Sequence, residues 1–339
     1  MAVADEILPG ADLGSAPKAQ RRRRTLFVRL ALILVAVSAV AYLGVSAVVY
    51  DRLSSATAGC PGGRDDPTSF AIQGVDTQPY WLPAPTDVRF PARDEPRITI
   101  AAWWVPVPAG LDASTVILVH GHNGCRANAP NELAAGMLHD HGIAVLLIDL
   151  RNHGDSTVED GRFAGGNKEY RDVLGAWDWL RAKGVPEARI GLLGFSLGAA
   201  TTMIAMGQEP RIAAIWEDSS YADVGEALRD ELTRNGYPTF LEAGGIFIGR
   251  VFVGDDLEAH SPLETTGLLY GRPIFITHGV RDQRLTVRYA FELAAGVAAH
   301  GQVADLWIVP DAGHTEALRL HPAEYERRLT AFFLAALGG

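Results

Sequence analysis

The sequence predicts an α/β fold: an eight-stranded, mostly parallel sheet flanked by helices, preceded by one transmembrane helix. Three observations lead to this prediction. Short β-rich runs alternate with helical patterns over the last three-quarters of the chain. Most runs from the third onward are apolar throughout, as strands buried on both faces are. A long uncharged run stands near the N-terminus.

The uncharged run covers residues 30–50, and its 21 positions are enough to cross a hydrocarbon layer of about 30 Å. Four arginines, Arg21 to Arg24, precede it. Because positive charge stays on the cytoplasmic side, these arginines predict a cytoplasmic tail over 1–29. The protein is then expected to cross the cell membrane once, with the bulk of the chain outside the cytoplasm. A cleaved signal peptide, with small residues at 54–58, is the alternative, which the length of the run disfavours.

Residues 51–70 are rich in Ser, Gly, Pro and Asp, so they predict a linker to one domain over 71–339. The chain has two cysteines, Cys60 and Cys125. Because Cys60 falls in the expected linker, we expect the two not to pair. The net charge is +3 over residues 1–50 and −13 over the rest. The strong negative charge of residues 51–339 argues against nucleic acid as a partner.

The expected elements follow in chain order. Strands are predicted at 88–90, 97–105, 115–120, 143–149, 189–194, 212–217, 273–278 and 303–309. Helices are predicted at about 130–141, 167–183, 196–207, 287–300 and 321–337. No helix separates the first two strands, which predicts an antiparallel edge. Residues 218–272 form a long gap in the alternation, which predicts a cap inserted above the carboxyl edge of the sheet.

The stretch GFSLG, residues 194–198, lies where a strand passes into a helix. A serine that points out of so tight a turn needs strained backbone angles. Side chains two residues to either side would then collide with neighbouring chain, and Gly194 and Gly198 have none. The pattern predicts that Ser196 is a nucleophile at the carboxyl edge of the sheet, where ligands bind in such folds. A turn with a capping serine is the plainer alternative.

A nucleophilic serine needs a base and an acid that orients the base. The seventh strand runs into THGVRD, ending at Asp282, and the eighth runs into VPDAGH, ending at His314. We expect His314 to take the proton of Ser196 and Asp282 to hold the imidazole. Asp218, at the end of the sixth strand, is the alternative acid, and the strand-end context favours Asp282.

The oxyanion that forms in acyl transfer needs two N–H donors. We expect one from Leu197, directly after the serine. The other is expected from the loop HGHNG, residues 120–124, with the N–H of His122 first and that of Asn123 second. His120 is expected to be structural.

These motifs together resemble the α/β-hydrolase superfamily over residues 85–339. The segment DLRNHGDS, residues 149–156, also resembles a family loop, with Asn152 where glycine is common. The short cap and single anchor resemble a branch of membrane-anchored acyl hydrolases and serine-aminopeptidase-like proteins. The resemblance implies an acyl-serine intermediate on a carboxylic ester or related acyl bond. A peptidase or amidase on the same triad, acting on peptides, and a catalytically silent binding module are the alternatives.

Neither a cofactor nor a metal is expected. The chain has no phosphate-binding glycine loop of the P-loop or dinucleotide-binding type. The histidines at 120, 122, 139 and 141, with Asp140, have no metal-ligand spacing. We therefore expect His139 and His141 to be solvated residues at a helix end.

Overall fold

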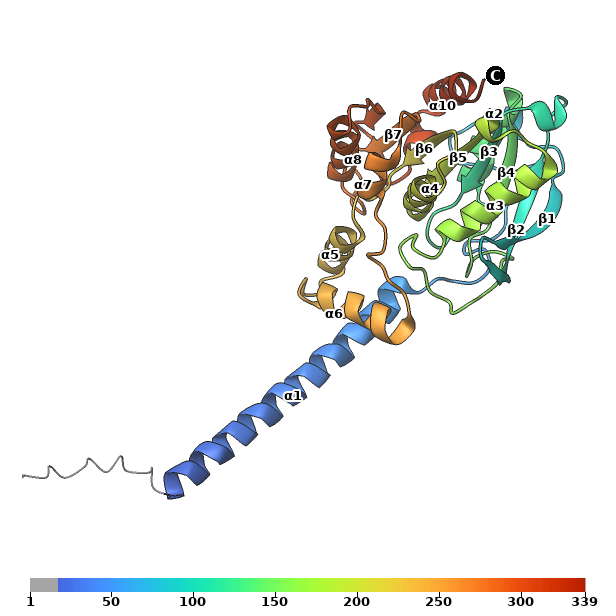
Figure 1. Cartoon of the computed structure of the whole chain (residues 1–339). Helices are drawn as coiled ribbons and strands as arrows, with labels where there is room; N and C mark the ends of the chain where they lie inside the picture. The colour runs from blue at the N-terminus through green and yellow to red at the C-terminus, as the bar shows by residue number, and fades with distance from the viewer. Residues whose placement is uncertain (1–17, 339) are drawn as a thin grey trace, which may run out of the picture. The chain divides into compact units, whose positions relative to one another are not determined.

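The computed structural model describes residues 18–338, so residues 1–17 of the expected tail and Gly339 lie outside the described residues. The chain divides into two compact units, Met1–Val45 and Ser46–Gly339. Helix α1 (Lys18–Ser54) contains the expected span and is long and apolar enough to cross a membrane (Figure 1). A signal sequence near an N-terminus can also be long and apolar enough to meet this criterion. The last turns of α1, from Ser46, belong to the second unit.

The second unit is built on one sheet with the strand order β1-β2-β4-β3-β5-β6-β7-β8. The strands are β1 (Thr86–Ala92), β2 (Glu95–Val105), β3 (Thr115–Val119), β4 (Ala144–Ile148), β5 (Ile190–Phe195), β6 (Ala214–Asp218), β7 (Ile274–Gly279) and β8 (Asp305–Val309). The pair β1–β2 is antiparallel, as is β2–β4, and β3 to β8 are parallel. The predicted fold class and antiparallel edge are confirmed.

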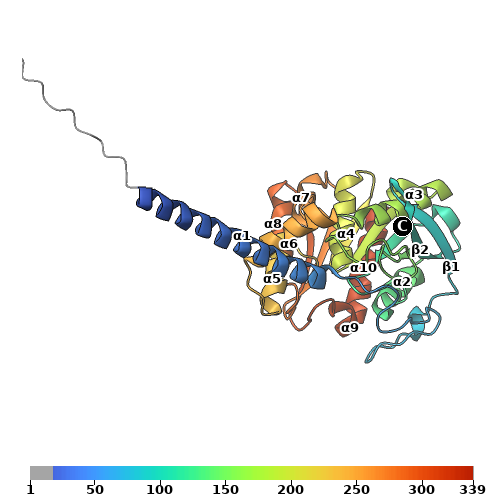
Figure 2. The same cartoon turned by 90° about the horizontal axis from the view of Figure 1, so that it is seen from below.

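Helices cover both faces of the sheet (Figure 2). On one face lie α3 (Tyr170–Lys183), α4 (Leu197–Gln208) and α8 (Arg288–Ala299), and on the other lie α2 (Ala129–Asp140), α9 (Ala317–Leu320) and α10 (Pro322–Leu337). Ile117 and Val119 of β3 enter the first core, whereas Val116 and Leu118 enter the second. Alternate residues thus face opposite helix layers, which explains why this strand is apolar at every position.

The cap region holds α5 (Val224–Arg234), α6 (Leu241–Ile248), a π-helical turn η4 (Gly249–Val253), α7 (Pro262–Thr265) and the 3₁₀ turn η5 (Thr266–Leu268). Asp218, where we expected the cap to begin, is the last residue of β6. Helix α7 packs on α4 and α8. The projecting part of the insertion is therefore α5, α6 and η4. Three more 3₁₀ turns lie at Gln78–Tyr80 (η1), Gly110–Asp112 (η2) and Glu187–Arg189 (η3).

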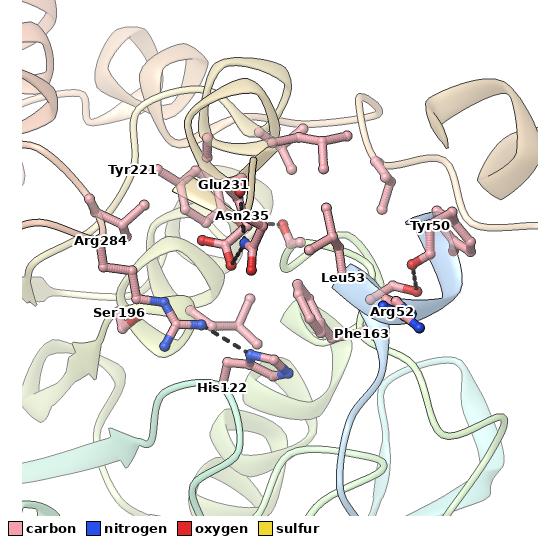
Figure 3. A pocket seen from close by; sticks show the side chains of 18 of the residues that line it. Tyr50, Arg52, Leu53, His122, Phe163, Ser196, Tyr221, Glu231, Asn235 and Arg284 are labelled. Atoms are coloured by element: carbon pink, nitrogen blue, oxygen red, sulfur yellow. Dashed lines mark hydrogen bonds between the residues drawn. The ribbon is translucent and has the colours of Figure 1, made fainter. Parts of the chain in front are cut away.

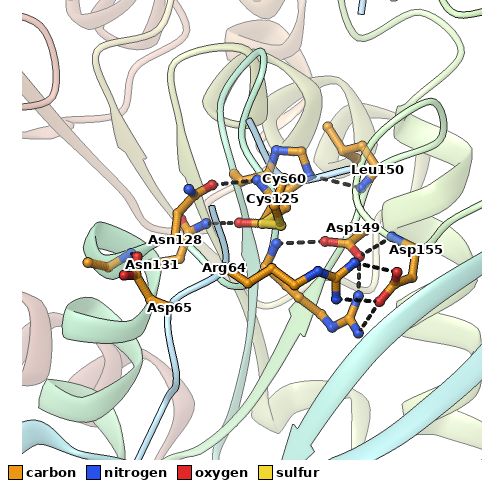
Figure 4. Close-up of a disulfide and its surroundings, with 12 residues drawn as sticks. Cys60, Arg64, Asp65, Cys125, Asn128, Asn131, Asp149, Leu150 and Asp155 are labelled. Atoms are coloured by element: carbon orange, nitrogen blue, oxygen red, sulfur yellow. Dashed lines mark hydrogen bonds and ion pairs between the residues drawn. A yellow bond between two sulfur atoms is a disulfide. The ribbon is translucent and has the colours of Figure 1, made fainter. Parts of the chain in front are cut away.

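The expectation about the cysteines is wrong: Cys60 and Cys125 form a disulfide, with their Cα atoms 5.3 Å apart (Figure 4). The segment after α1 has a linker-like composition, but it is fastened to the domain. Short bridges join it to residues 154 and 162, and Arg64 forms an ion pair with Asp155. These contacts hold Cys60 against the loop that follows β3, where Cys125 lies.

Candidate active site

Ser196 stands between β5 and α4, with φ 55° and ψ −118°. This left-handed backbone is strained for a serine. The flanking glycines explain how the turn is built. A Cβ on Gly194 would lie 2.3 Å from the carbonyl oxygen of Gly198, and one on Gly198 would lie 2.2 Å from that of Val119. The sequence GFSLG thus allows two main-chain segments to touch, as predicted.

The structure brings the three predicted side chains together. His314 Nε2 lies 2.8 Å from Ser196 Oγ, and His314 Nδ1 lies 2.7 Å from Asp282 Oδ2. His314 follows β8 and Asp282 follows β7, so two neighbouring strands of the sheet deliver them to the same edge. The arrangement allows the hydroxyl proton to pass to an imidazole whose other nitrogen is held by a carboxylate.

The Asp282 carboxylate is buried, and both of its oxygens have hydrogen-bond donors. Its Oδ1 accepts the main-chain N–H groups of Arg284 and Leu285 at 2.8 and 2.9 Å. Its Oδ2 lies 3.3 Å from His278 Nε2 in addition to His314. Burial alone would raise the pKa of Asp282, but the hydrogen bonds from His278 and His314 hold this pKa well below its usual value. Asp282 is therefore ionised at neutral pH.

His278 is a neighbour of the site that the sequence analysis did not single out. It lies in β7, four residues before Asp282, and its side chain is fully buried. Burial opposes its charged form, yet Asp282 and Glu217 raise the pKa of His278 above its usual value. A histidine in an otherwise apolar strand, just ahead of a strand-end aspartate, was the available signal.

Asp218, the alternative acid, has other partners. Its Oδ1 accepts from the Ser219 hydroxyl at 2.8 Å and its Oδ2 accepts from the Tyr325 hydroxyl at 3.0 Å. Burial raises the pKa of Asp218 to about 6. The acid hydrogen-bonded to His314 is Asp282.

The loop after β3 lies directly against the nucleophile. A Cβ on Gly121 would lie 3.2 Å from Ser196 Cβ. Leu197 is the first residue of α4, and within residues 18–338 neither its N–H nor that of His122 donates a hydrogen bond to a protein group. The N–H of Asn123, the second candidate, lies 3.4 Å from His153 Nε2. His122 and Leu197 both line the pocket at Ser196.

The side chain of His122 ties this loop to two other segments. Its Nε2 lies 2.8 Å from the carbonyl oxygen of Ser55, and its Nδ1 lies 3.3 Å from an Arg284 nitrogen. Burial, helped by Arg284, lowers the pKa of His122 to about 4. The ring is therefore neutral, with Nε2–H donating to Ser55 and Nδ1 accepting from Arg284. The N–H of Thr57 adds a bond to the Asn123 side chain.

A pocket of about 420 Å³ opens beside Ser196 (Figure 3). Most of its wall is apolar or aromatic, from Leu53, Phe163, Leu197, Tyr221, Val224, Ala227, Leu228, Tyr237, Leu257 and Leu285. Its polar and charged side chains include Arg52, Ser54, His122, Asn123, Glu231, Asn235 and Arg284. The end of α1, from Tyr50 to Ser54, forms part of the wall. From the sequence, Tyr50 was expected in the membrane span and residues 51–54 in the linker, because nothing in their composition indicates contact with a substrate.

The loop at 149–156 has a supporting structure. Asn152 stands at φ 63°, a backbone conformation that asparagine tolerates better than most residues, which explains its place where glycine is common. Its side-chain oxygen accepts the main-chain N–H groups of residues 159, 160 and 161. The residue shapes the turn and does not line the pocket.

The histidines considered as metal ligands each face a main-chain carbonyl. His120 Nδ1 lies 2.7 Å from the Gly121 oxygen, and its Nε2 accepts the N–H of Leu150. His139 and His141 lie near the carbonyl oxygens of residues 106 and 137. Among the described residues, Asp140, His141 and Glu326 gather their ligand atoms within 4.8 Å on the surface.

The comparisons with known proteins concern the domain that carries these residues. Residues 132–339 match the model of the prolyl oligopeptidase family (Peptidase S9). The chain belongs to the prolyl oligopeptidase family. Among curated proteins it is similar to the uncharacterized peptidase YuxL of Bacillus subtilis (strain 168), at 23% identity over 290 residues. That match covers 79% of this chain and 41% of YuxL, so the chain spans less than half the length of this relative.

Solved structures show the same fold at low identity. The esterase Pf2001 of Pyrococcus furiosus is 23% identical, with a TM-score of 0.60, and the match covers 80% of this chain and 98% of the esterase. The acylaminoacyl peptidase of Pyrococcus horikoshii is 17% identical, with a TM-score of 0.57, and the match covers 80% of this chain and 44% of the peptidase. Together with its membership of the prolyl oligopeptidase family, these likenesses show that the domain has the α/β-hydrolase fold.

Proposed function

We propose that Ser196, His314 and Asp282 are a catalytic triad and that the protein cleaves a carboxylic ester or related acyl bond through an acyl-Ser196 intermediate. The observation that carries the proposal is the unbroken chain of hydrogen bonds from Ser196 Oγ through His314 to Asp282. The strained serine backbone supports it, because strain of this kind collects at functional sites.

The proposed reaction follows from the geometry. His314 Nε2 removes the proton of Ser196 as Oγ attacks the acyl carbon, and Asp282 stabilises the imidazolium that forms. The main-chain N–H groups of Leu197 and His122 receive the developing oxyanion. His314 then returns the proton to the leaving group. Water, activated by the same histidine, attacks the acyl-serine and releases the acid.

The pocket favours an acyl chain over a charged peptide. Its wall is mostly apolar, and Glu231 is its one carboxylate among the described residues. That carboxylate already accepts from the side chains of Arg234 and Asn235. A substrate ammonium would therefore compete with an existing ion pair. Peptide or amide cleavage is the second candidate, and the name of the family supports it. The intact hydrogen-bond chain disfavours a silent binding module.

We also propose that α1 stays attached as a membrane anchor, with the domain outside the cytoplasm. Cleavage within residues 54–58 would remove Tyr50 and Leu53 from the pocket wall. The arginines at 21–24 support a cytoplasmic N-terminus. The Cys60–Cys125 disulfide supports an oxidising compartment for the domain.

The test is to treat the full chain in detergent with a fluorophosphonate probe, which reacts covalently with activated serines. We expect Ser196 to be labelled, and Ser196→Ala to abolish labelling while the melting temperature stays unchanged. Ser54→Ala, which removes another serine of the same pocket, is the matched control and should be labelled like the parent. A folded parent that reacts no faster than Ser196→Ala would refute the triad. A panel of acyl esters and aminoacyl amides then separates the two substrate classes.

A further inference from the structure

The cap exposes large apolar side chains on one short segment. Phe247 is 44% exposed, Val251 is 55% exposed and Phe252 is 69% exposed, although Ile246 and Ile248 beside them are buried. The rings of Phe247 and Phe252 lie 6.1 Å apart, edge to face. We call Phe247, Val251 and Phe252 the cap face. A contiguous apolar group of this kind on a folded domain indicates a contact surface.

The segment that carries the cap face contacts the last turns of α1, which belong to the same compact unit. The Tyr50 hydroxyl donates to Asp255 Oδ2 at 2.8 Å. A Cβ on Gly249, which lies between Phe247 and Val251, would be 3.0 Å from the Tyr50 ring. Tyr50 is the last residue of the 21-residue uncharged run. If this run spans the bilayer, its length of about 31 Å matches a hydrocarbon core of about 30 Å, so Tyr50 lies at the lipid boundary.

The turn of α1 inside this unit continues the apolar surface. Val48 is exposed, whereas Val49 and Tyr50 are buried against the domain. Arg250 stands among the cap-face residues, with its head group turned to Asp256 and Glu258. At the edge of a bilayer, apolar rings enter the lipid while charged head groups such as that of Arg250 stay in water. This continuity indicates lipid as the occupant.

The end of α1 and the chain just after the cap face form part of the pocket wall. Leu53 and Ser54 come from the end of α1, and Leu257 follows the cap face in the chain. We propose, on the basis of the acyl hydrolase and anchor proposed above, that the cap face rests in the outer surface of the bilayer and that the acyl substrate enters the pocket from the lipid. The substrate class is then an acyl ester that resides in a membrane.

The position of the cap face can be measured without reference to catalysis. Because Cys60 and Cys125 are paired, Phe252→Cys offers one free thiol for an environment-sensitive nitrobenzoxadiazole label. The full chain is reconstituted in phosphatidylcholine vesicles, with and without lipids that carry a quencher on the acyl chain. Phe291→Cys is the matched control, because Phe291 is 52% exposed but belongs to α8.

We expect the label at 252 to shift to the blue and to be quenched by the acyl-chain quencher, and the label at 291 to stay in water. Equal, unquenched emission at both positions would overturn the proposal. A blue shift that grows with the ratio of protein to lipid and is not quenched would also overturn it, because a second copy of the chain would then cover the cap face. Failure of the chain to integrate into vesicles would do the same.

Substrate entry is tested by rates. Phe247→Ser/Phe252→Ser is compared with Phe291→Ser on a soluble short-chain ester and on a long-chain ester embedded in vesicles. We expect the first variant to lose about tenfold in rate on the embedded ester only, because two lost aromatic anchors weaken seating on lipid. Equal rates on the embedded ester would refute entry from lipid. A parent inactive on every ester would instead refute the proposed function, and the label would still locate the cap face.

Discussion

The Cys60–Cys125 disulfide gives a prediction whose magnitude follows from the chain. The bond closes a loop of 65 residues. In the chain-entropy account, a crosslink over such a loop lowers the entropy of the unfolded chain enough to contribute about 4 kcal/mol at 25 °C. We therefore expect Cys60→Ser/Cys125→Ser to lower the free energy of unfolding by about that amount.

The measurement is urea-induced unfolding of parent and double variant in the same detergent, followed by tryptophan fluorescence. Reducing agent should lower the unfolding midpoint of the parent to that of the variant and leave the variant unchanged. Coincident midpoints for the unreduced parent and the variant would refute the reasoning.

The same change should affect turnover. Cys125 lies three residues after His122, in the loop that lies against Ser196. Without the disulfide, this loop loses its covalent link to the segment after α1 and keeps only weaker ties there, such as the bond from His122 to the Ser55 carbonyl and the bond from Thr57 to Asn123. Misplacement of a catalytic donor by about 1 Å costs up to about 10²-fold in rate, so we expect kcat to fall by about 10- to 100-fold. An unchanged kcat would show that the remaining bonds suffice.

Three further predictions concern single residues. Asp282→Asn should lower kcat by about 10⁴-fold without loss of folding, because His314 loses the partner that fixes its tautomer; steady-state kinetics with a circular dichroism control test this. Gly198→Ala should abolish fluorophosphonate labelling, because its Cβ would lie 2.2 Å from a main-chain oxygen that no side-chain rotation relieves. Burial raises the pKa of Glu132 to about 8, from 4.5 in an unfolded chain. Stability should therefore fall as pH rises between these values, and Glu132→Gln should flatten that fall in melts at pH 5 and pH 8. Parallel profiles of stability against pH for the parent and Glu132→Gln would contradict this prediction.

The sheet could be predicted from the sequence because its strands are buried on both faces. Each of the strands from β3 to β7 is a short, largely apolar run, so its existence and its place along the chain follow from composition. The candidate site residues followed from the same logic, since Ser196 comes directly after β5, and Asp282 and His314 come a few residues after β7 and β8. The parallel order of β5 to β8 then brings these strand ends to one edge.

The features that the sequence did not predict depend on contacts between residues that are far apart in the chain. Cys60 was judged by the composition of its own segment, and nothing local shows that residues 55–60 lie along the loops at 154 and 162. The place of Tyr50 in the pocket wall was hidden for the same reason, because an aromatic residue at the end of an apolar run also fits a membrane interface. The role of His278 beside Asp282 requires the register of β7, which composition does not give.

If α1 anchors the domain as proposed, the bond between His122 and the carbonyl oxygen of Ser55 has a consequence for release of the domain. A protease that cut the chain between Ser55 and Cys60 would leave α1 held to the domain by non-covalent contacts alone, such as the bond from Tyr50 to Asp255, while the disulfide kept the far side of the cut attached. Loss of those contacts would then free the domain. This release would separate His122 from its partner and open the pocket where Leu53 and Ser54 stand. Shedding and inactivation would then be one event, and the activity would be confined to the surface that bears the intact chain.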